Sequence, residues 1–131
     1  MKFYIGSGMK NCELVNNYAN LLKDNGWEQT YDWVKNVSYD VCLKDMIEYA
    51  TLESQGIVDS DIVIILLPAG RGAHIELGMA TALNKRVFLC SSTKEGFSIE
   101  NTVAFYELPK IIKLIGTAEE NVKRIIKSKE L

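Results

Sequence analysis

The chain has 131 residues, a length that suits one domain with a real hydrophobic core. Its hydrophobic content of 47% and charged content of 24% are typical of a globular protein. A formal net charge of −2 gives no electrostatic basis for nucleic-acid binding, and no apolar run approaches the ~18 residues of a membrane span.

The cysteines give no sign of a metal site or a disulfide framework. Cys12, Cys42 and Cys90 are widely spaced, form no C-x-x-C pair and are accompanied by a single histidine, so no metal is expected. Three free thiols are typical of a reducing compartment, and the first residues lack the apolar length of a signal peptide. These features predict a cytoplasmic location.

The first part of the chain alternates between strand-like and helix-like patterns. Residues 2–5 predict a short first strand, which Gly6-Ser7-Gly8 ends in a tight turn. Residues 11–25 carry apolar side chains at helical spacing, and Gly26 is the residue expected just past a helix C-terminus. Residues 29–34 then predict a second, more polar strand near an edge of the sheet.

A loop over residues 36–39 and a helical region over about residues 40–58 follow. Thr51 and Gly56 predict that this helix is broken or bent into two pieces. Its inward-facing residues are expected to be Leu43, Ile47, Ala50 and Ile57.

The central stretch reads as a strand, a Gly-rich loop and a helix. Ile62–Leu67 is an unbroken apolar run rich in β-branched residues, which is typical of a strand covered on both faces. Pro68 ends the strand, Ala69–Gly72 form a flexible loop, and a helix of small and apolar residues continues toward Lys85. Residues 86–90 predict another short strand.

The last third begins with a long polar loop over residues 91–101. Residues 102–108 are assigned to no element, and residues 111–115 predict a fifth strand. Thr117 and Glu120 have the spacing of a capping box, which predicts the start of the last helix.

This alternation, without repeats or linkers, predicts a single α/β domain over residues 1–131. The expected architecture has three layers, with a five-stranded parallel sheet between helices, and is flavodoxin- or Rossmann-like. Ligands of such sheets bind beyond the carboxyl ends of the strands.

Glu76 is the candidate catalytic residue because it follows the Gly-rich loop in the first or second turn of a helix. The partial positive charge at a helix N-terminus favours an ionised carboxylate. A carboxylate beside a sugar is suited to attack an anomeric carbon or to stabilise an oxocarbenium ion. The alternative interpretation is that Glu76 only complements the helix dipole.

Two glycine-rich turns are candidates for contacts with a phosphate or a sugar oxygen through backbone N–H groups. The first is Gly6-Ser7-Gly8, and the second is Gly70-Arg71-Gly72. Neither completes the dinucleotide fingerprint, because Asn11 and Ile75 stand where a third glycine is required. Glycines are also needed for turns at strand ends, so a purely structural role is the alternative for both turns.

Three segments together resemble the nucleoside 2-deoxyribosyltransferase family, which includes the 2′-deoxynucleoside 5′-phosphate N-hydrolases. They are Y-I-G-S-G at residues 4–8, L-E-S-Q-G-I-V-D-S-D-I-V-I-I-L at residues 52–66, and R-G-A-H-I-E-L-G-M-A-T-A-L-N-K-R-V at residues 71–87. The similarity extends roughly from Lys2 to Thr117, and its most specific part is the E-L-G-x-A-x-A-L-N-K motif.

The resemblance implies a reaction at an N-glycosidic bond. Glu76 matches the family nucleophile, which attacks C1′ of the sugar, and Tyr4 matches a strand tyrosine that orients the nucleophile or the sugar. Glu53 stands where the family usually has an aspartate that contacts or protonates the leaving base. Tyr4 as a core aromatic residue and Glu53 on a solvated helix face are the alternatives.

This sequence departs from the family at Gly70, where transferases often carry an aspartate and phosphate-using hydrolases a serine. Arg71 is a candidate contact for a 5′-phosphate, and His74 for the mouth of the site; both have a solvent-exposed alternative. Trp33 is a candidate for stacking on the base or for a buried anchor. Asn101 lies in the loop from which family members lend a polar residue to a neighbouring subunit.

The expected activity is cleavage or transfer at the N-glycosidic bond of (deoxy)nucleosides or their 5′-monophosphates, without a cofactor. The expected partners are a small-molecule nucleoside or nucleotide and further copies of the chain, in a homo-oligomer with shared active sites. A non-catalytic nucleotide-binding module of the same fold is the alternative. A dinucleotide or flavin protein is a third possibility that the incomplete glycine fingerprint disfavours.

Overall fold

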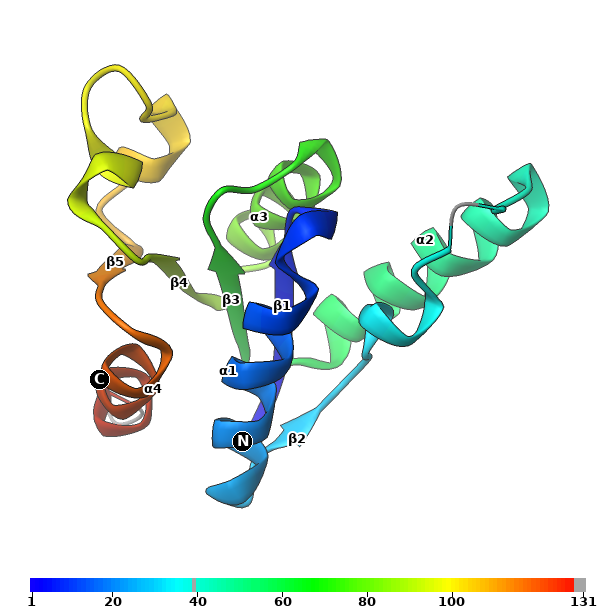
Figure 1. Cartoon of the computed structure of the whole chain (residues 1–131), viewed down its shortest axis with the longest axis horizontal. Coiled ribbons are helices and arrows are strands. Elements are labelled where there is room, and N and C mark those ends of the chain that lie inside the picture. Colours follow the sequence, from blue (N-terminus) through cyan, green and yellow to red (C-terminus); the bar gives the residue numbers. More distant parts are fainter. Residues whose placement is uncertain (39, 129–131) are drawn as a thin grey trace.

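The computed structural model describes residues 1–38 and 40–128. A parallel five-stranded sheet with the order β2-β1-β3-β4-β5 forms its centre (Figure 1). The strands are β1 (Lys2–Ser7), β2 (Glu28–Gln29), β3 (Ile62–Leu66), β4 (Arg86–Ser91) and β5 (Ile111–Ile115).

Helices cover both faces of the sheet. They are α1 (Cys12–Asp24), α2 (Leu43–Asp59), α3 (Arg71–Ala82) and α4 (Ala118–Lys127). Helix α1 packs beside α4 on one face, and α2 packs beside α3 on the other (Figure 1). The predicted α/β fold, with a parallel sheet between two helical layers, is therefore confirmed.

The centre of the sheet is apolar because β1 and β3 are covered on both faces. Every residue of β3 is buried, and Phe3 pairs with Ile62 at the start of the shared register. A run of β-branched residues suits this position, since neither face of the strand meets water. This rigid pair of strands carries the turns around which the candidate site is built.

The predicted helix ends are confirmed where the sequence held a specific signal. Gly26 follows α1 with φ of 85°, a left-handed conformation that glycine adopts without steric cost. The Thr117 side chain accepts a hydrogen bond from the Glu120 backbone N–H, and the Glu120 side chain accepts one from the Thr117 backbone N–H, which completes the capping box.

The second predicted strand was wrong over most of its length. Strand β2 has only two residues, and Trp33–Asn36 forms a 3₁₀-helix, η2. Asp32 caps η2 by accepting a hydrogen bond from the Val34 backbone N–H, a local interaction that competes with strand pairing.

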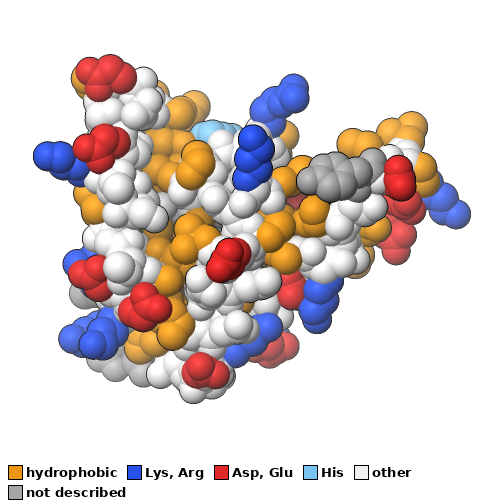
Figure 2. Space-filling model, in the orientation of Figure 1, with side chains coloured by type: hydrophobic (Ala, Val, Ile, Leu, Met, Phe, Trp, Pro, Cys, Tyr) orange, Lys and Arg blue, Asp and Glu red, His pale blue; other side chains and the backbone are white. Residues whose placement is uncertain are grey.

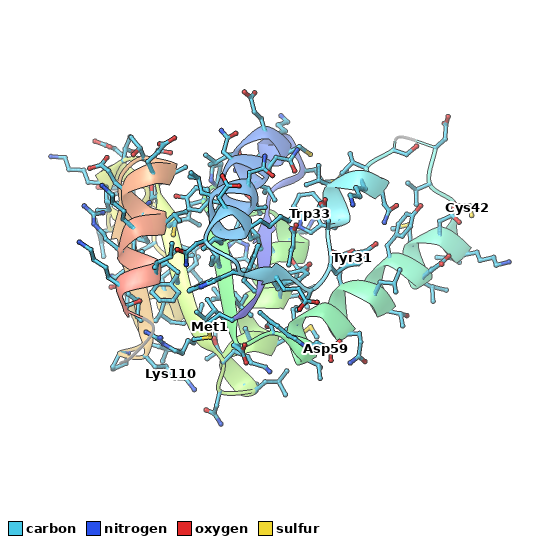
Figure 3. The ribbon with its side chains drawn as sticks, turned by 90° about the horizontal axis from the view of Figure 1, so that it is seen from below. Met1, Tyr31, Trp33, Cys42, Asp59 and Lys110 are labelled. Atoms are coloured by element: carbon cyan, nitrogen blue, oxygen red, sulfur yellow. The ribbon has the colours of Figure 1, made fainter. Side chains whose placement is uncertain are left out.

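The predicted break in the next helix was also wrong, because α2 is continuous from Leu43 to Asp59. Leu43, Ile47 and Ala50 were expected to face inward, but all three are exposed, whereas Ile57 is buried as predicted. The N-terminal half of α2 extends away from the sheet, with Cys42 at the far end and Asp59 at the near end (Figure 3). An apolar pattern at helical spacing therefore did not mark a core face here.

The long connection between β4 and β5 contains two short 3₁₀-helices, η3 (Lys94–Phe97) and η4 (Ala104–Glu107). Residues 102–108, which the sequence assigned to no element, thus include η4. The predicted loop over residues 36–39 begins with the last residue of η2, and Tyr39 lies outside the described residues. No helix in the described ranges is long and apolar enough to cross a bilayer.

Gly56 lies where α2 packs most closely against the sheet. A Cβ atom at this position would lie 2.9 Å from Tyr31 Cβ and 3.1 Å from Tyr4 Cδ2. The glycine therefore allows a close approach of α2 and does not break the helix.

We expect Gly56→Ala to lower the free energy of unfolding by about 1–3 kcal/mol, because the added methyl group overpacks against a Cβ atom that cannot move aside. Gly78→Ala in α3 is the matched control, since among the described residues no atom outside the adjoining helix backbone lies within 4 Å of its added Cβ. The control should be neutral or stabilising by about 1 kcal/mol through helix propensity. Equal unfolding curves for both variants, measured in urea, would contradict the close packing at Gly56.

Candidate functional site

A cavity of about 900 Å³ opens at the carboxyl ends of β1 and β3. These neighbouring strands send their following helices to opposite faces of the sheet, which makes this edge the topological switch point where ligands of such folds bind. The turn after β1, the loop after β3, η2 and the cavity-facing side of α2 form its walls. Its volume suits a small molecule of nucleotide size.

Glu76 lies inside this cavity rather than on the surface. It is in the second turn of α3 and is only 8% exposed. The carboxylate lies directly over β1, because a Cβ atom at Gly6 would be 2.8 Å from Glu76 Oε1. The first glycine of the β1 turn is thus required by the position of the candidate nucleophile.

Tyr4 and Glu53 converge on Glu76 from two other elements. The Tyr4 hydroxyl, from β1, donates to Glu76 Oε2 and lies 3.4 Å from Glu53 Oε1, which α2 supplies. Tyr4 is fully buried, so its hydroxyl has a fixed position. The structure therefore brings the three predicted catalytic residues together, although they are far apart in the sequence.

Burial controls the protonation of the two carboxyl groups. It raises the pKa of Glu76 to about 8; the negative charge of Glu53 adds to this, and the hydrogen bond from Tyr4 opposes it. Burial also raises the pKa of Glu53, which hydrogen bonds from Glu76 and Tyr4 counteract. Burial together with the two carboxylates raises the pKa of the Tyr4 phenol far above its ordinary value.

The sequence-based expectation that the helix dipole favours an ionised Glu76 is opposed in the free protein by burial, which raises the pKa of this carboxyl group. The dipole acts mainly within the first turn of a helix, whereas Glu76 lies in the second turn and is buried. Two carboxyl groups with raised pKa values beside one phenol are expected to share a proton near neutral pH. Such a pair can supply one ionised nucleophile and one carboxylic acid at the same time.

The two glycine-rich turns lie against each other at the rim of the cavity. The Gly8 backbone N–H donates to the Pro68 carbonyl oxygen at 3.3 Å, and a Cβ atom on Gly70 would be 3.8 Å from Gly8 Cα. Ser7 Oγ donates to the Leu66 carbonyl oxygen. The N–H of Gly8 and the hydroxyl of Ser7 are thus already engaged, while Ser7, Gly8, Gly70 and Gly72 all line the cavity.

Charged groups are segregated within the cavity. Among its lining residues, the cations are Lys10 and Arg71, from the β1 turn and the start of α3, and the acids are Glu53 and Glu76. Figure 2 shows Lys and Arg side chains projecting from the upper edge of the molecule near this opening. No group of three or more potential metal ligands occurs in the described parts of the chain.

Trp33 lines the cavity but is also a buried anchor, because its indole N–H donates to the Ile5 carbonyl oxygen at 2.7 Å. Tyr31 and Trp33 lie between the sheet and α2 (Figure 3). The buried-anchor interpretation thus describes its position, whereas stacking on a base stays a prediction that its place on the cavity wall leaves open.

Two predicted site residues lie elsewhere. His74 and Asn101 line a second cavity of about 520 Å³, on the other side of the loop after β3. The side chain of Asn101 donates to the Glu95 carbonyl oxygen, and that of His74 contacts Tyr106. Within one copy of the chain, neither residue lines the cavity that holds Glu76.

Sequence reasoning named Glu53 as a site residue but missed Met46 and Tyr49, which belong to the wall that α2 contributes. Met46, Tyr49, Ala50 and Glu53 line the cavity with the i, i+3, i+4, i+7 spacing of a single helix face. That spacing was visible in the sequence, but Leu43 and Ile47 define a competing apolar face that was chosen instead. Lys10 was missed because the turn after β1 was considered only for its glycines.

No protein-family model matches this sequence, and no curated protein matches it. Solved structures that are similar over almost the whole chain include the following two. CMP N-glycosidase BcmB of Clostridium botulinum has 17% identity and a TM-score of 0.68, covering 96% of this chain and 99% of that chain. A conserved protein from Enterococcus faecalis V583 has 16% identity and a TM-score of 0.63, covering 97% and 98%. The resemblance seen in the sequence is thus confirmed at the level of the fold.

The raised pKa of Glu76 predicts a pH dependence of stability. Between the ordinary value of 4.5 and about 8 the folded state binds more protons than the unfolded state, so this contribution to stability is lost as the pH rises through about 8. Glu76→Gln should therefore remove a decrease on the order of a few kcal/mol in the free energy of unfolding between about pH 5 and pH 9.

Urea unfolding at several pH values checks this, with Glu119→Gln, an exposed glutamate on α4, as the control. If wild type and Glu76→Gln have parallel stability profiles, the Glu76 carboxyl group does not titrate abnormally.

Proposed function

We propose that this protein is an N-glycosidase that releases the base from nucleoside or deoxynucleoside 5′-monophosphates, with Glu76 as the nucleophile. The observation that carries the proposal is the convergence of Glu76, Tyr4 and Glu53 at the base of the cavity. The fold shared with a CMP N-glycosidase supports the same class of reaction.

In the first step, an ionised Glu76 oxygen attacks C1′ while the C1′–N bond breaks and its electron pair passes to the base. The carboxylic acid of Glu53 gives its proton to the departing base and becomes a carboxylate. The Tyr4 hydroxyl donates to Glu76 and favours the tautomer of the pair in which the proton is on Glu53. Water then attacks the glycosyl ester and gives a proton to Glu53, which frees Glu76.

A 5′-phosphate is proposed because both cations of the cavity lie at its rim, on the side of the two glycine-rich turns. The start of α3 also presents backbone N–H groups there, and helix N-termini favour anions. Lys10 and Arg71 would hold the phosphate, and Gly72 leaves room for its close approach. The carboxyl pair lies deeper, where the sugar carbon would be placed.

The base is proposed to lie against the wall formed by α2 and η2. Met46, Tyr49 and Ala50 offer apolar and aromatic surface on one side, and Trp33 on the other, which suits the flat face of a nucleobase. Glu53 follows on the same face of α2 and can therefore reach an acceptor atom on the edge of the base.

We expect Glu76→Gln to lower base release by about a thousandfold or more, because the amide is not a nucleophile. The assay incubates protein with a panel of nucleosides, deoxynucleosides and their 5′-monophosphates, and measures free bases by chromatography. Leu83→Ala, on an exposed residue at the far end of α3, is the control and should match the wild type. A second free base added to the mixture detects transfer, as distinct from hydrolysis.

Equal turnover by wild type and Glu76→Gln would remove Glu76 from the mechanism. A non-catalytic nucleotide-binding module is the second candidate, and the raised pKa of Glu76 favours it because a protonated carboxyl group is a poor nucleophile. Tight binding of a nucleotide that is recovered intact would support this candidate and contradict the enzyme.

A homodimer with shared sites is proposed as the assembly. Asn101 lies in a segment that exposes Ile99 and Phe105, and the outer half of α2 beside the cavity exposes Leu43 and Ile47. If two copies paired these surfaces, they would bury apolar area, and Asn101 could reach the cavity of the second copy.

Complementation tests this arrangement. Glu76→Gln and Asn101→Ala are each expected to be impaired, whereas an unfolded and refolded equimolar mixture should regain about a quarter of wild-type activity through heterodimers with one complete site. Light scattering gives the mass of each sample. A monomer in solution, or a mixture no more active than its components, would contradict the shared site.

A further inference from the structure

His74 forms a bridge between two segments that are distant in the sequence. Its Nδ1 lies 2.8 Å from the carbonyl oxygen of Gly70, the N-cap of α3, and its Nε2 lies 2.7 Å from the Tyr106 hydroxyl in η4. The two rings are stacked, with centroids 5.8 Å apart and an interplanar angle of 7°. Tyr106 is only 3% exposed, so the bridge ends on a fixed group.

The partners determine which nitrogen of the neutral imidazole carries the proton. A carbonyl oxygen only accepts hydrogen bonds, so Nδ1 must be the donor to Gly70. Nε2 is then the acceptor, and the Tyr106 hydroxyl donates to it. This arrangement requires the Nδ1–H tautomer.

The bridge fixes the peptide group that begins α3. The Gly70 carbonyl oxygen accepts from the His74 side chain and from the His74 backbone N–H at 3.1 Å, so it points along the helix. In a trans peptide the N–H lies opposite the carbonyl group, and the Arg71 N–H therefore points out of the helix N-terminus. Arg71 and Gly72 line the cavity that holds Glu76, whereas His74 acts from the second cavity.

We propose that His74 is a positioning residue for the phosphate end of the substrate site: with Tyr106 it holds Gly70, and thereby the backbone donors that begin α3, without touching the substrate. This inference rests on the proposed function for the identity of the ligand. It assigns His74 a role on the opposite side of the loop from the substrate.

The single histidine of the chain makes the contact directly measurable. Long-range ¹H–¹⁵N correlation spectra of a sample without a histidine tag, recorded at pH 8, should show the neutral imidazole as the Nδ1–H tautomer. Tyr106→Phe should lower the population of this tautomer. A wild-type imidazole in the Nε2–H form, or averaged between the two tautomers, would overturn the bridge whether or not the protein is an enzyme.

The positioning role is tested by dissociation constants for CMP and cytidine, measured by calorimetry, and by KM and kcat for substrates that the wild type cleaves. His74→Leu should raise the dissociation constant and KM for the nucleotide roughly threefold to tenfold, leaving the nucleoside and kcat nearly unchanged. His74→Asn places an amide N–H near the position of Nδ1 and should restore most of the affinity. His74→Gln, whose amide lies near the position of Nε2, should not.

Thr81→Val is the control, because it removes a side-chain hydrogen bond to the Leu77 carbonyl oxygen in the same helix without touching Gly70. It should leave nucleotide affinity unchanged. Equal losses for nucleotide and nucleoside in His74→Leu, or no rescue by asparagine, would overturn the positioning role while the enzyme remained active. If the wild type neither binds nor cleaves any nucleotide, the proposed function fails, and the positioning role fails with it.

Discussion

The site depends on one phenol hydroxyl, which lies between the buried carboxyl group of Glu76 and the half-buried carboxyl group of Glu53. Tyr4 has a single proton to donate, and both Glu76 and Glu53 lie within its reach. Water would ordinarily solvate two such acids, but here α2 and α3 cover them, so ionising both at once is costly. The arrangement therefore favours one protonated carboxyl group beside one ionised carboxylate. The first can act as a general acid and the second as a nucleophile, and cleavage of an N-glycosidic bond can use both.

The surrounding fold is shaped to permit this contact. Glycine occurs at the two places where the carboxylate and the tyrosine approach their neighbours most closely: Gly6 lies under Glu76, and Gly56 lies against Tyr4 and Tyr31. At Gly6 a methyl group would displace the carboxylate, and at Gly56 it would push α2 from the sheet. Both glycines serve packing, because neither has the positive φ of Gly26 or Gly116. The stability of the sheet and the geometry of the site are thus coupled through residues that carry no chemistry of their own.

Prediction from sequence succeeded where local signals and global packing agree. The all-apolar β3, the capping box at Thr117 and the glycine after α1 each have a local cause, and they agree with the parallel sheet that the alternation of strands and helices predicted. It failed in the segment from η2 through α2, where Leu43 and Ile47 are exposed and the cavity takes the neighbouring face of the helix. The spacing of apolar residues in a sequence does not distinguish a helix face that packs in the core from one that contacts a partner or a ligand. The neighbouring sequence also gave no sign that His74 and Asn101 lie outside the cavity of Glu76, because their position depends on how the β4–β5 connection folds over α3.

The loop after β3 connects these observations, because Pro68 and Ala69 line both cavities. On one side this loop meets the turn after β1 through the Gly8–Pro68 hydrogen bond, and on the other side His74 ties its last residue to Tyr106. Groups that bind a substrate on one face of a loop can therefore be held in place from the other face, at a distance from the chemistry. Since Glu76 lies six residues further along the same helix, a shift at Gly70 would move the proposed phosphate-binding end of the site more than the carboxyl pair, which β1 fixes independently through Tyr4. This separation is the physical reason to expect that affinity for the phosphate and the rate of bond cleavage respond to different residues.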